Sequence, residues 1–110
     1  VIDQRAFDRI NGYLADAKQN AKILAGGTAD GSTGWFVKPT LVETTDPKYR
    51  LMCEEIFGPI VTAYVYDDAK WEETLKLVDE TSDYALTGAV FAQDRAALKQ
   101  AHAALRHSAG

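Results

Sequence analysis

Residues 58–66 read Gly-Pro-Ile-Val-Thr-Ala-Tyr-Val-Tyr, and this stretch decides the fold. Gly58 and Pro59 stop any helix that precedes them, because both residue types are unfavourable inside a helix. The seven residues that follow are apolar on both faces, which is typical of a strand that helices cover on both sides. We therefore predict a buried strand over residues 60–66.

The residues after this strand predict a helix, a second buried strand and a second helix. Asp67 and Asp68 are suited to cap the first helix, and Asp94 is suited to cap the second. Residues 86–92, which lie between the two helices, are again apolar and rich in β-formers. Two buried strands joined through a helix predict a right-handed parallel crossover. The inward-facing residues are expected to be Trp71, Thr74, Leu75 and Val78 in the first helix, and Leu98, Ala101 and Leu105 in the second.

The residues before the corner predict a further helix and two short strands. Asp3 is a good cap for a helix over residues 4–20, which has apolar residues at helical spacing. A short strand follows at residues 22–25. Residues 35–43 also favour a strand, but Pro39 has no N–H to donate, so this strand lies at an edge or is broken there.

These elements, with one or two helical turns expected within residues 49–55, predict the α/β class. We expect part of an open, mostly parallel twisted sheet with helices on its faces. The 110 residues suit one domain or a piece of one.

Composition excludes several classes of protein. The net charge of -4, with dispersed Lys and Arg, gives no basic face for nucleic acid. The apolar stretches are far shorter than the roughly 20 residues that a membrane helix needs. A single cysteine makes no internal disulfide, and the first residues do not resemble a signal peptide, so a reducing compartment is expected.

Most residue types that commonly carry chemistry have an ordinary structural interpretation here. Cys53 is followed by two acidic residues, which disfavour the thiolate that a nucleophile needs. His102 and His107 are five residues apart, whereas metal ligands on one helical face are spaced by three or four. Four glycines match neither the dinucleotide-binding fingerprint nor a P-loop, so we interpret them as turn residues. They are Gly26, Gly27, Gly31 and Gly34.

Residues 54–59, Glu-Glu-Ile-Phe-Gly-Pro, allow two interpretations. The first is an ordinary turn before a strand. The second is a binding corner, because Glu55 and Phe57 lie two residues apart and, in an extended chain, point to the same side. A carboxylate accepts two hydrogen bonds from the hydroxyl groups of a sugar, and an aromatic ring packs beside a flat heterocycle.

The chain resembles the aldehyde dehydrogenase superfamily in three segments. Residues 54–61 resemble its E-E-x-F-G-P motif, and residues 34–41 resemble the G-x-[FY]-[VIF]-x-P-T-[LIV] segment that precedes this motif in the family. Residues 84–91 resemble the family's Y-G-L-[ST]-[AG]-x-V-F strand. The order and spacing also agree, so the similarity runs over the whole chain. Cys53 corresponds to a variable position of the family, so the resemblance does not make it the catalytic thiol.

Within this family, the chain is most similar to the branch of Δ1-pyrroline-5-carboxylate dehydrogenases, which oxidise L-glutamate γ-semialdehyde to L-glutamate. The similarity to this branch lies in residues 63–66, 86–91 and 105–110. Ala85 departs from the glycine that is usual in the superfamily, a departure that some members of the branch share.

The resemblance implies an NAD-dependent enzyme of proline catabolism that acts on a small-molecule aldehyde. It implies that Glu55 binds the nicotinamide-side ribose hydroxyls of NAD and that Phe57 packs by the nicotinamide ring, with Leu86 lining the same region. We expect both side chains to face the crevice at the carboxyl ends of the strands. The resemblance also implies a homo-oligomeric full-length protein in the bacterial cytoplasm or, in a eukaryote, the mitochondrial matrix.

Residues 1–110 are expected to be a middle piece of the family's catalytic domain, inactive alone, without the cofactor domain and the nucleophilic cysteine. The start at Val1 is in keeping with this expectation. The alternative is a free-standing, non-enzymatic α/β module that binds a partner through an open sheet edge. The two hypotheses differ in stability, because a piece of a domain leaves the apolar faces of residues 60–66 and 86–92 exposed.

Overall fold

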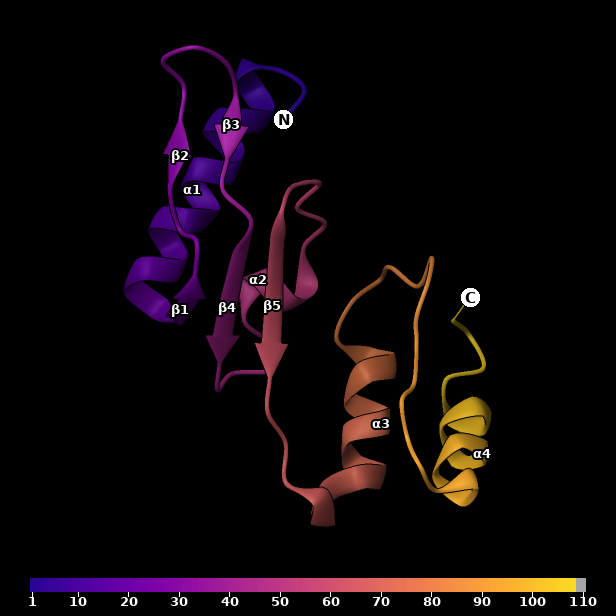
Figure 1. The fold of residues 1–110 in the computed structure, drawn as a ribbon. Coiled ribbons are helices and arrows are strands. Elements are labelled where there is room, and N and C mark those ends of the chain that lie inside the picture. Colours follow the sequence, from indigo (N-terminus) through magenta and orange to yellow (C-terminus); the bar gives the residue numbers. More distant parts are fainter. Residues whose placement is uncertain (109–110) are drawn as a thin grey trace. The chain divides into compact units, whose positions relative to one another are not determined.

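The computed structural model describes residues 1–108, so the end of the segment 105–110 lies outside the described residues. The chain forms two compact units, Val1–Val65 and a second unit that begins at Tyr66. Each unit is described by itself below. Figure 1 gives the order of the helices and strands.

The first unit begins with the long helix α1, Gln4–Asn20, as the sequence predicts. Asp3 caps this helix, because its Oδ1 atom accepts a hydrogen bond of 2.8 Å from the backbone N–H of Ala6. The helix ends at Ala21, which has an extended backbone. The side chains that α1 buries in the core of the first unit are Ile10, Tyr13, Leu14 and Ala17.

Three strands form the main sheet of the first unit, in the order β1-β4-β5. They are β1, Lys22–Ala25, β4, Thr40–Thr44, and β5, Ile60–Tyr64. Strand β4 pairs antiparallel with β1 and parallel with β5, as the arrowheads in Figure 1 show. The predicted α/β class with a partial sheet and helices is confirmed, but this sheet is mixed and not mostly parallel.

The predicted break at Pro39 is confirmed. On one side of it lies the two-residue strand β3, Phe36–Val37, and on the other side lies β4. Strand β3 pairs antiparallel with β2, Ala29–Asp30, in a small second sheet that the sequence analysis did not predict. Strand β3 lies within the segment predicted to be a strand, whereas the two residues of β2 are too few to show an alternation of apolar and polar side chains.

Strand β5 is shorter and more exposed than predicted. It ends at Tyr64, and the side chain of Val61 is 65% exposed. In register with β5, Val42 of the central strand β4 is fully buried and belongs to the core. The face of β5 that carries Val61 has no such cover within the described residues, so the expectation of a strand buried on both faces is wrong for this chain.

The second unit contains two helices that pack together. The 3₁₀ helix η1, Asp68–Lys70, leads into α3, Trp71–Glu80, and the second helix is α4, Arg95–Ala104. The predicted caps are confirmed in part, since Asp67 accepts from the N–H of Ala69 at the start of η1 and Asp94 accepts from that of Ala96. The indole N–H of Trp71 donates a hydrogen bond of 3.0 Å to Oε1 of Gln100, and this bond joins the two helices.

The predicted inward stripes of these helices are only partly buried. Leu75 and Ala101 are buried, whereas Val78 is more than half exposed. No helix in the described part of the chain is both long and apolar enough to cross a membrane.

Residues 86–92 do not form the predicted strand. They have no regular secondary structure, and Leu86 and Phe91 are 86% and 94% exposed. A strand persists only where a neighbouring strand pairs with its N–H and C=O groups, and no described strand pairs with this segment. The predicted parallel crossover is therefore wrong for the described residues, although the apolar composition of the segment is that of a strand.

Candidate functional site

The corner of residues 54–59 connects α2, Arg50–Cys53, to strand β5. Because the corner precedes β5 in the chain, it lies at the amino end of this strand (Figure 1). The expectation that Glu55 and Phe57 face a crevice at the carboxyl ends of the strands is therefore wrong. Carboxyl-end crevices are the general rule for open α/β sheets, and this corner does not follow that rule.

The carboxylate of Glu54 is held from two sides. The hydroxyl group of Tyr13, from helix α1, donates a hydrogen bond of 2.6 Å to Oε2 of Glu54. The guanidinium group of Arg50 donates through Nε to Oε1 at 3.2 Å and through Nη2 to Oε2 at 3.0 Å. Such a fork of two parallel bonds fixes the orientation of a carboxylate as well as its position.

Arg50 also joins this contact to the middle of α1. Its Nη1 atom lies 3.4 Å from Oδ2 of Asp16, and the hydroxyl group of Tyr49 donates to the other oxygen of Asp16. The guanidinium carbon of Arg50 stands 4.7 Å from the centre of the Tyr13 ring, in a cation–π contact. We call these five residues, Tyr13, Asp16, Tyr49, Arg50 and Glu54, the anchoring cluster.

The pKa values in the anchoring cluster follow from these bonds. The hydrogen bonds from Arg50 and then Tyr13 lower the pKa of Glu54, and the hydrogen bond from Tyr49 is the main cause of the lowered pKa of Asp16. The bond to Glu54 raises the pKa of Tyr13, and burial raises the pKa of Tyr49. At neutral pH the cluster therefore contains two carboxylates, one guanidinium group and two phenol hydroxyls that donate hydrogen bonds to the carboxylates.

The remainder of the corner alternates between fixed and exposed groups. The main-chain oxygen of Glu55 accepts a bond of 3.4 Å from Nη1 of Arg9, while its side chain is exposed. Ile56 is buried in the core, and Phe57 is 77% exposed. Gly58 lies against Ile10, so that a Cβ atom on it would come within 2.4 Å of the Ile10 Cδ1 atom.

The backbone of Phe57 is in the left-handed region, with φ of 53°. Among the described residues, only glycines share a positive φ with it. A residue with a side chain pays on the order of 1–2 kcal/mol for this conformation, and such residues are found preferentially at functional sites. The sequence analysis did not predict this feature, since Gly58 is the residue for which such a backbone would be expected.

Together, these contacts present two exposed groups on a fixed corner. Glu54, Ile56 and Gly58 attach the corner to α1 and to the core, and the Glu55 carboxylate and the Phe57 ring are left accessible. The structure thus keeps both predicted site residues exposed. An exposed acceptor for hydroxyl groups and an exposed flat apolar ring, two residues apart in the chain, suit a ligand that combines a sugar with a heterocycle.

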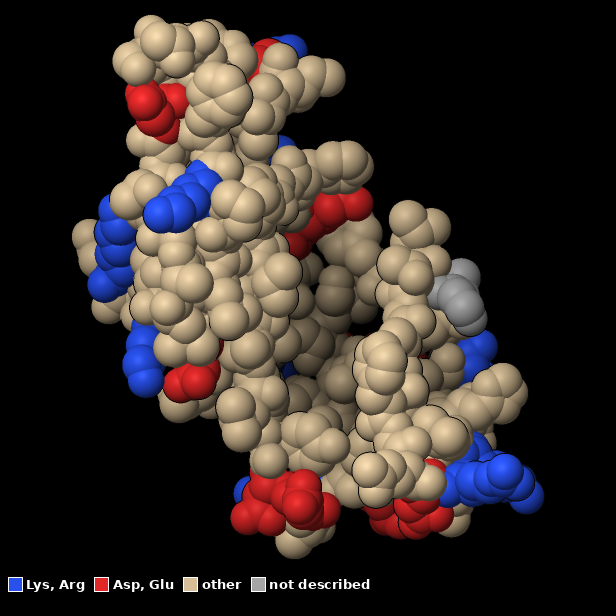
Figure 2. All heavy atoms as spheres, viewed as in Figure 1, with Lys and Arg blue, Asp and Glu red and all other residues tan. Residues whose placement is uncertain are grey.

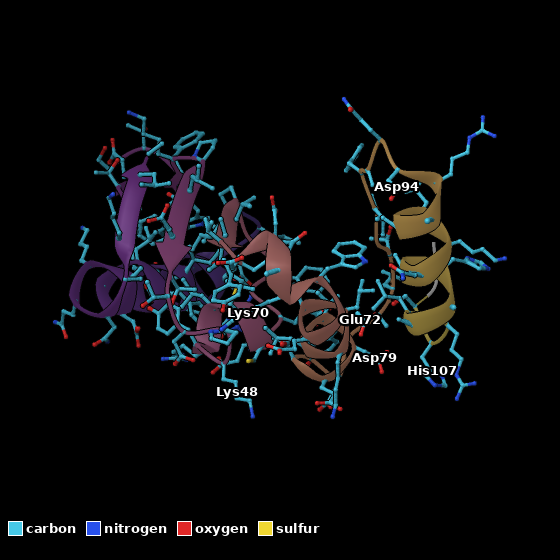
Figure 3. The ribbon with its side chains drawn as sticks, turned by 90° about the horizontal axis from the view of Figure 1, so that it is seen from below. Lys48, Lys70, Glu72, Asp79, Asp94 and His107 are labelled. Carbon is cyan, nitrogen blue, oxygen red and sulfur yellow. The ribbon has the colours of Figure 1, made fainter. Side chains whose placement is uncertain are left out.

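The other candidate residues of the sequence analysis form no group of metal ligands within residues 1–108. Cys53 is partly exposed and makes a contact of its own. Figure 3 shows Asp94 and His107 at opposite ends of α4, and no group of three potential metal ligands occurs in residues 1–108. Leu86 is exposed in the second unit, and its proposed place beside Phe57 stays a prediction. On the face seen in Figure 2, basic and acidic side chains lie in small separate groups.

The sequence analysis did not predict the anchoring cluster, which lies next to the exposed groups of the corner. One signal was available, since Arg50 and Glu54 have the i,i+4 spacing of a helical ion pair. Nothing in the sequence links Tyr13 to Glu54, which lies 41 residues further along the chain. The contact depends on how α1 packs on the sheet, which local patterns do not specify.

Comparison with known proteins agrees with the resemblance. A family model described as "Aldehyde dehydrogenase family" matches residues 1–109. Two mitochondrial Delta-1-pyrroline-5-carboxylate dehydrogenases, from Bos taurus and Dictyostelium discoideum, are 53% and 52% identical to the chain over its whole length. The chain spans only 20% of the length of each of these relatives.

A solved structure is also similar. It is the Delta-pyrroline-5-carboxylate dehydrogenase from Mycobacterium tuberculosis bound with NAD, which matches 96% of the chain at 41% identity with a TM-score of 0.84. The match covers 19% of that protein. The sequence and the fold of the chain thus match the same kind of protein.

Proposed function

Because the chain belongs to the aldehyde dehydrogenase family, we propose that it is part of an NAD-dependent enzyme that oxidises L-glutamate γ-semialdehyde to L-glutamate in proline catabolism. The whole-chain identity of 50% or more to several Delta-1-pyrroline-5-carboxylate dehydrogenases supports the choice of substrate. The relative solved with NAD supports the choice of cofactor.

The corner fits this cofactor. NAD combines ribose hydroxyl groups with a flat nicotinamide ring, and when bound it accepts a hydride from the aldehyde carbon. The exposed carboxylate of Glu55 is suited to accept from the ribose hydroxyls on the nicotinamide side. The exposed ring of Phe57 is suited to pack by the nicotinamide. These two accessible groups on an otherwise fixed corner are the observation that carries the proposal.

The proposed task of the chain is to orient the cofactor. Hydride transfer requires the reacting carbons to be held at near-attack distance, and a misplacement of about 1 Å can cost roughly 100-fold in rate. Because the corner is already attached to α1 and the core, less backbone entropy is lost when Glu55 and Phe57 bind the cofactor. The ring of Phe57 also excludes water from the face that it covers.

The other parts of the proposal concern the full-length protein. It acts on a small-molecule aldehyde, forms a homo-oligomer, and works in the mitochondrial matrix or the bacterial cytoplasm. Residues 1–110 are proposed to be a partial catalytic domain without the cofactor domain. The mitochondrial names of several eukaryotic relatives support the first compartment for a eukaryotic source.

The substitution Glu55→Gln in the full-length protein tests the proposal. An amide keeps the size of the side chain but loses the charge and one acceptor, so we expect weaker NAD binding by calorimetry and slower turnover of the aldehyde. Glu72→Gln, which changes an exposed carboxylate of α3 (Figure 3), is the matched control and should change neither quantity. Unchanged NAD binding and turnover in Glu55→Gln would contradict the ribose role.

A further inference from the structure

We propose that Tyr13 and Arg50 are positioning residues for the reaction, and that they act on Glu55 and Phe57 through the carboxylate of Glu54. The inference rests on the proposed function, because it assumes that the corner binds NAD. Neither residue is expected to touch NAD or the aldehyde. Their contribution is the orientation of the two groups that do.

The first step of the argument is the way in which Glu54 is held. Its side chain is 43% exposed, and an exposed glutamate is normally free to change its rotamer. Here both carboxylate oxygens accept from Arg50, and one of them also accepts from Tyr13. Three charge-assisted bonds to one exposed carboxylate exceed what a typical surface ion pair provides.

The second step is the position of Glu54 in the chain. It directly precedes Glu55. The backbone N–H of Glu54 donates a hydrogen bond of 2.9 Å to the main-chain oxygen of Arg50, and this bond closes the end of α2. Further along the corner, Ile56 is buried in the core between Glu55 and Phe57, and Gly58 lies against Ile10. Glu54 is therefore the attachment on the upstream side.

The third step is the weak contact that Glu55 itself makes. Exposed Arg9 donates to the main-chain oxygen of Glu55, but at 3.4 Å this bond is long. Phe57 has a left-handed backbone, which persists only where the surroundings enforce it. Without the attachment at Glu54, Glu55 is held on its downstream side alone, by buried Ile56, and fewer contacts enforce the strained backbone of Phe57.

The fourth step concerns the choice of residue types. Arg50 contacts Glu54, Asp16 and the face of the Tyr13 ring at once. A planar guanidinium group makes all three contacts, whereas the ammonium group of lysine makes no bidentate fork. Tyr13 buries its ring in the core and brings its hydroxyl group to the surface, so that α1 directly determines where Glu54 lies.

The experiment compares two tyrosine variants of the full-length protein. Tyr13→Phe removes only the hydroxyl group that contacts Glu54 and keeps the buried ring and its contact with Arg50. Tyr49→Phe is the matched control, because it removes a hydroxyl group that contacts the carboxylate of Asp16 in the same cluster. Both variants should lose thermal stability to a similar extent.

We expect Tyr13→Phe to raise the Kd of NAD measured by calorimetry, and the KM for NAD, about tenfold. Hydrogen exchange followed by mass spectrometry should become faster in peptides that span residues 54–60. Tyr49→Phe should leave the Kd of NAD and the exchange of these peptides near their original values. A smaller amount of folded protein would lower the apparent kcat but would change neither the Kd nor the KM.

Equal effects of the two variants on the Kd of NAD, or no effect of Tyr13→Phe, would overturn the proposal. If Tyr13→Phe does not fold, Arg50→Lys replaces it in the experiment. We expect the same rise in the Kd of NAD for Arg50→Lys, and an unchanged Kd would overturn the proposal. Glu55→Gln separates the two levels of inference. When that variant weakens NAD binding and Tyr13→Phe does not, only the positioning role is wrong, and when Glu55→Gln has no effect, the proposed function is wrong.

Discussion

Ile10 of α1 and Gly58 of the corner are packed so closely that a Cβ atom on Gly58 would lie 2.4 Å from Cδ1 and 3.0 Å from Cγ1 of Ile10. Gly58 is thus required by a close approach, since its φ is not in the left-handed region that favours glycine. Because Ile10 is fully buried, its side chain has little room to move aside.

The substitution Gly58→Ala should therefore destabilise the full-length protein by about 1–3 kcal/mol, as overpacking of a core does. Urea unfolding measures this loss. The double variant Ile10→Val/Gly58→Ala should recover part of it, because valine lacks the Cδ1 atom that clashes. Ile10→Val alone, which should cost about 1 kcal/mol, is the control. A double variant less stable than the sum of the two single changes would contradict the close-packing explanation.

Phe57 allows its ring and its backbone to be tested separately. Phe57→Ala and Phe57→Gly both remove the ring, and we expect both to weaken NAD binding measured by calorimetry. Only glycine adopts a φ of 53° without steric cost. Phe57→Gly should therefore be the more stable of the two by about 1 kcal/mol in urea unfolding. Equal NAD affinity in both variants and the original protein would show that the ring does not contact the cofactor.

Local patterns in the sequence predict the helices of this chain well. Asp3, Asp67 and Asp94 are short acceptors placed before apolar residues at helical spacing, and each of them caps a helix in the structure. Pro39 likewise divides its segment, because the missing N–H is a local property of that residue.

Features that depend on distant parts of the chain are not predicted. Residues 86–92 have the composition of a strand, but pairing requires a neighbour, and composition does not supply one. The residue type of Phe57 does not indicate its left-handed backbone, and the contact of Tyr13 with Glu54 results from packing between α1 and the corner. The motif in residues 54–59 identifies which side chains matter, whereas only the structure indicates what holds them.

The anchoring cluster predicts a dependence of stability on acid. The folded protein lowers the pKa of Glu54, chiefly through Arg50, so protons bind this group more weakly in the folded than in the unfolded state. The resulting stabilisation is present above the unfolded pKa of about 4.3 and is lost as the pH falls through the lowered folded value. Asp16, whose pKa is also lowered, acts in the same direction.

Urea unfolding at neutral pH and at a pH of about 3.5 measures this effect. The Glu54→Gln variant should lose less stability between the two conditions than the original protein, because its side chain does not titrate. Glu72→Gln, which changes an exposed side chain of α3, controls for the removal of one carboxylate elsewhere. An identical loss in the Glu54→Gln variant and the original protein would contradict the contribution of Glu54.

The exposed apolar side chains allow the two hypotheses for the chain to be separated. Val61 and Val65 are exposed on and beside β5, an edge strand of its described sheet, and Leu86 and Phe91 are exposed in the second unit. Such surfaces and edges favour association with further protein. We therefore expect the isolated 110-residue chain to melt without a sharp transition, to form larger species by light scattering, and to produce no NADH with aldehyde and NAD.

Val61→Lys should reduce the association, because a lysine on an edge strand opposes pairing with another chain. A sharp melt of a monomeric chain would favour the free-standing interaction module, and formation of NADH would contradict the view that residues 1–110 only orient the cofactor.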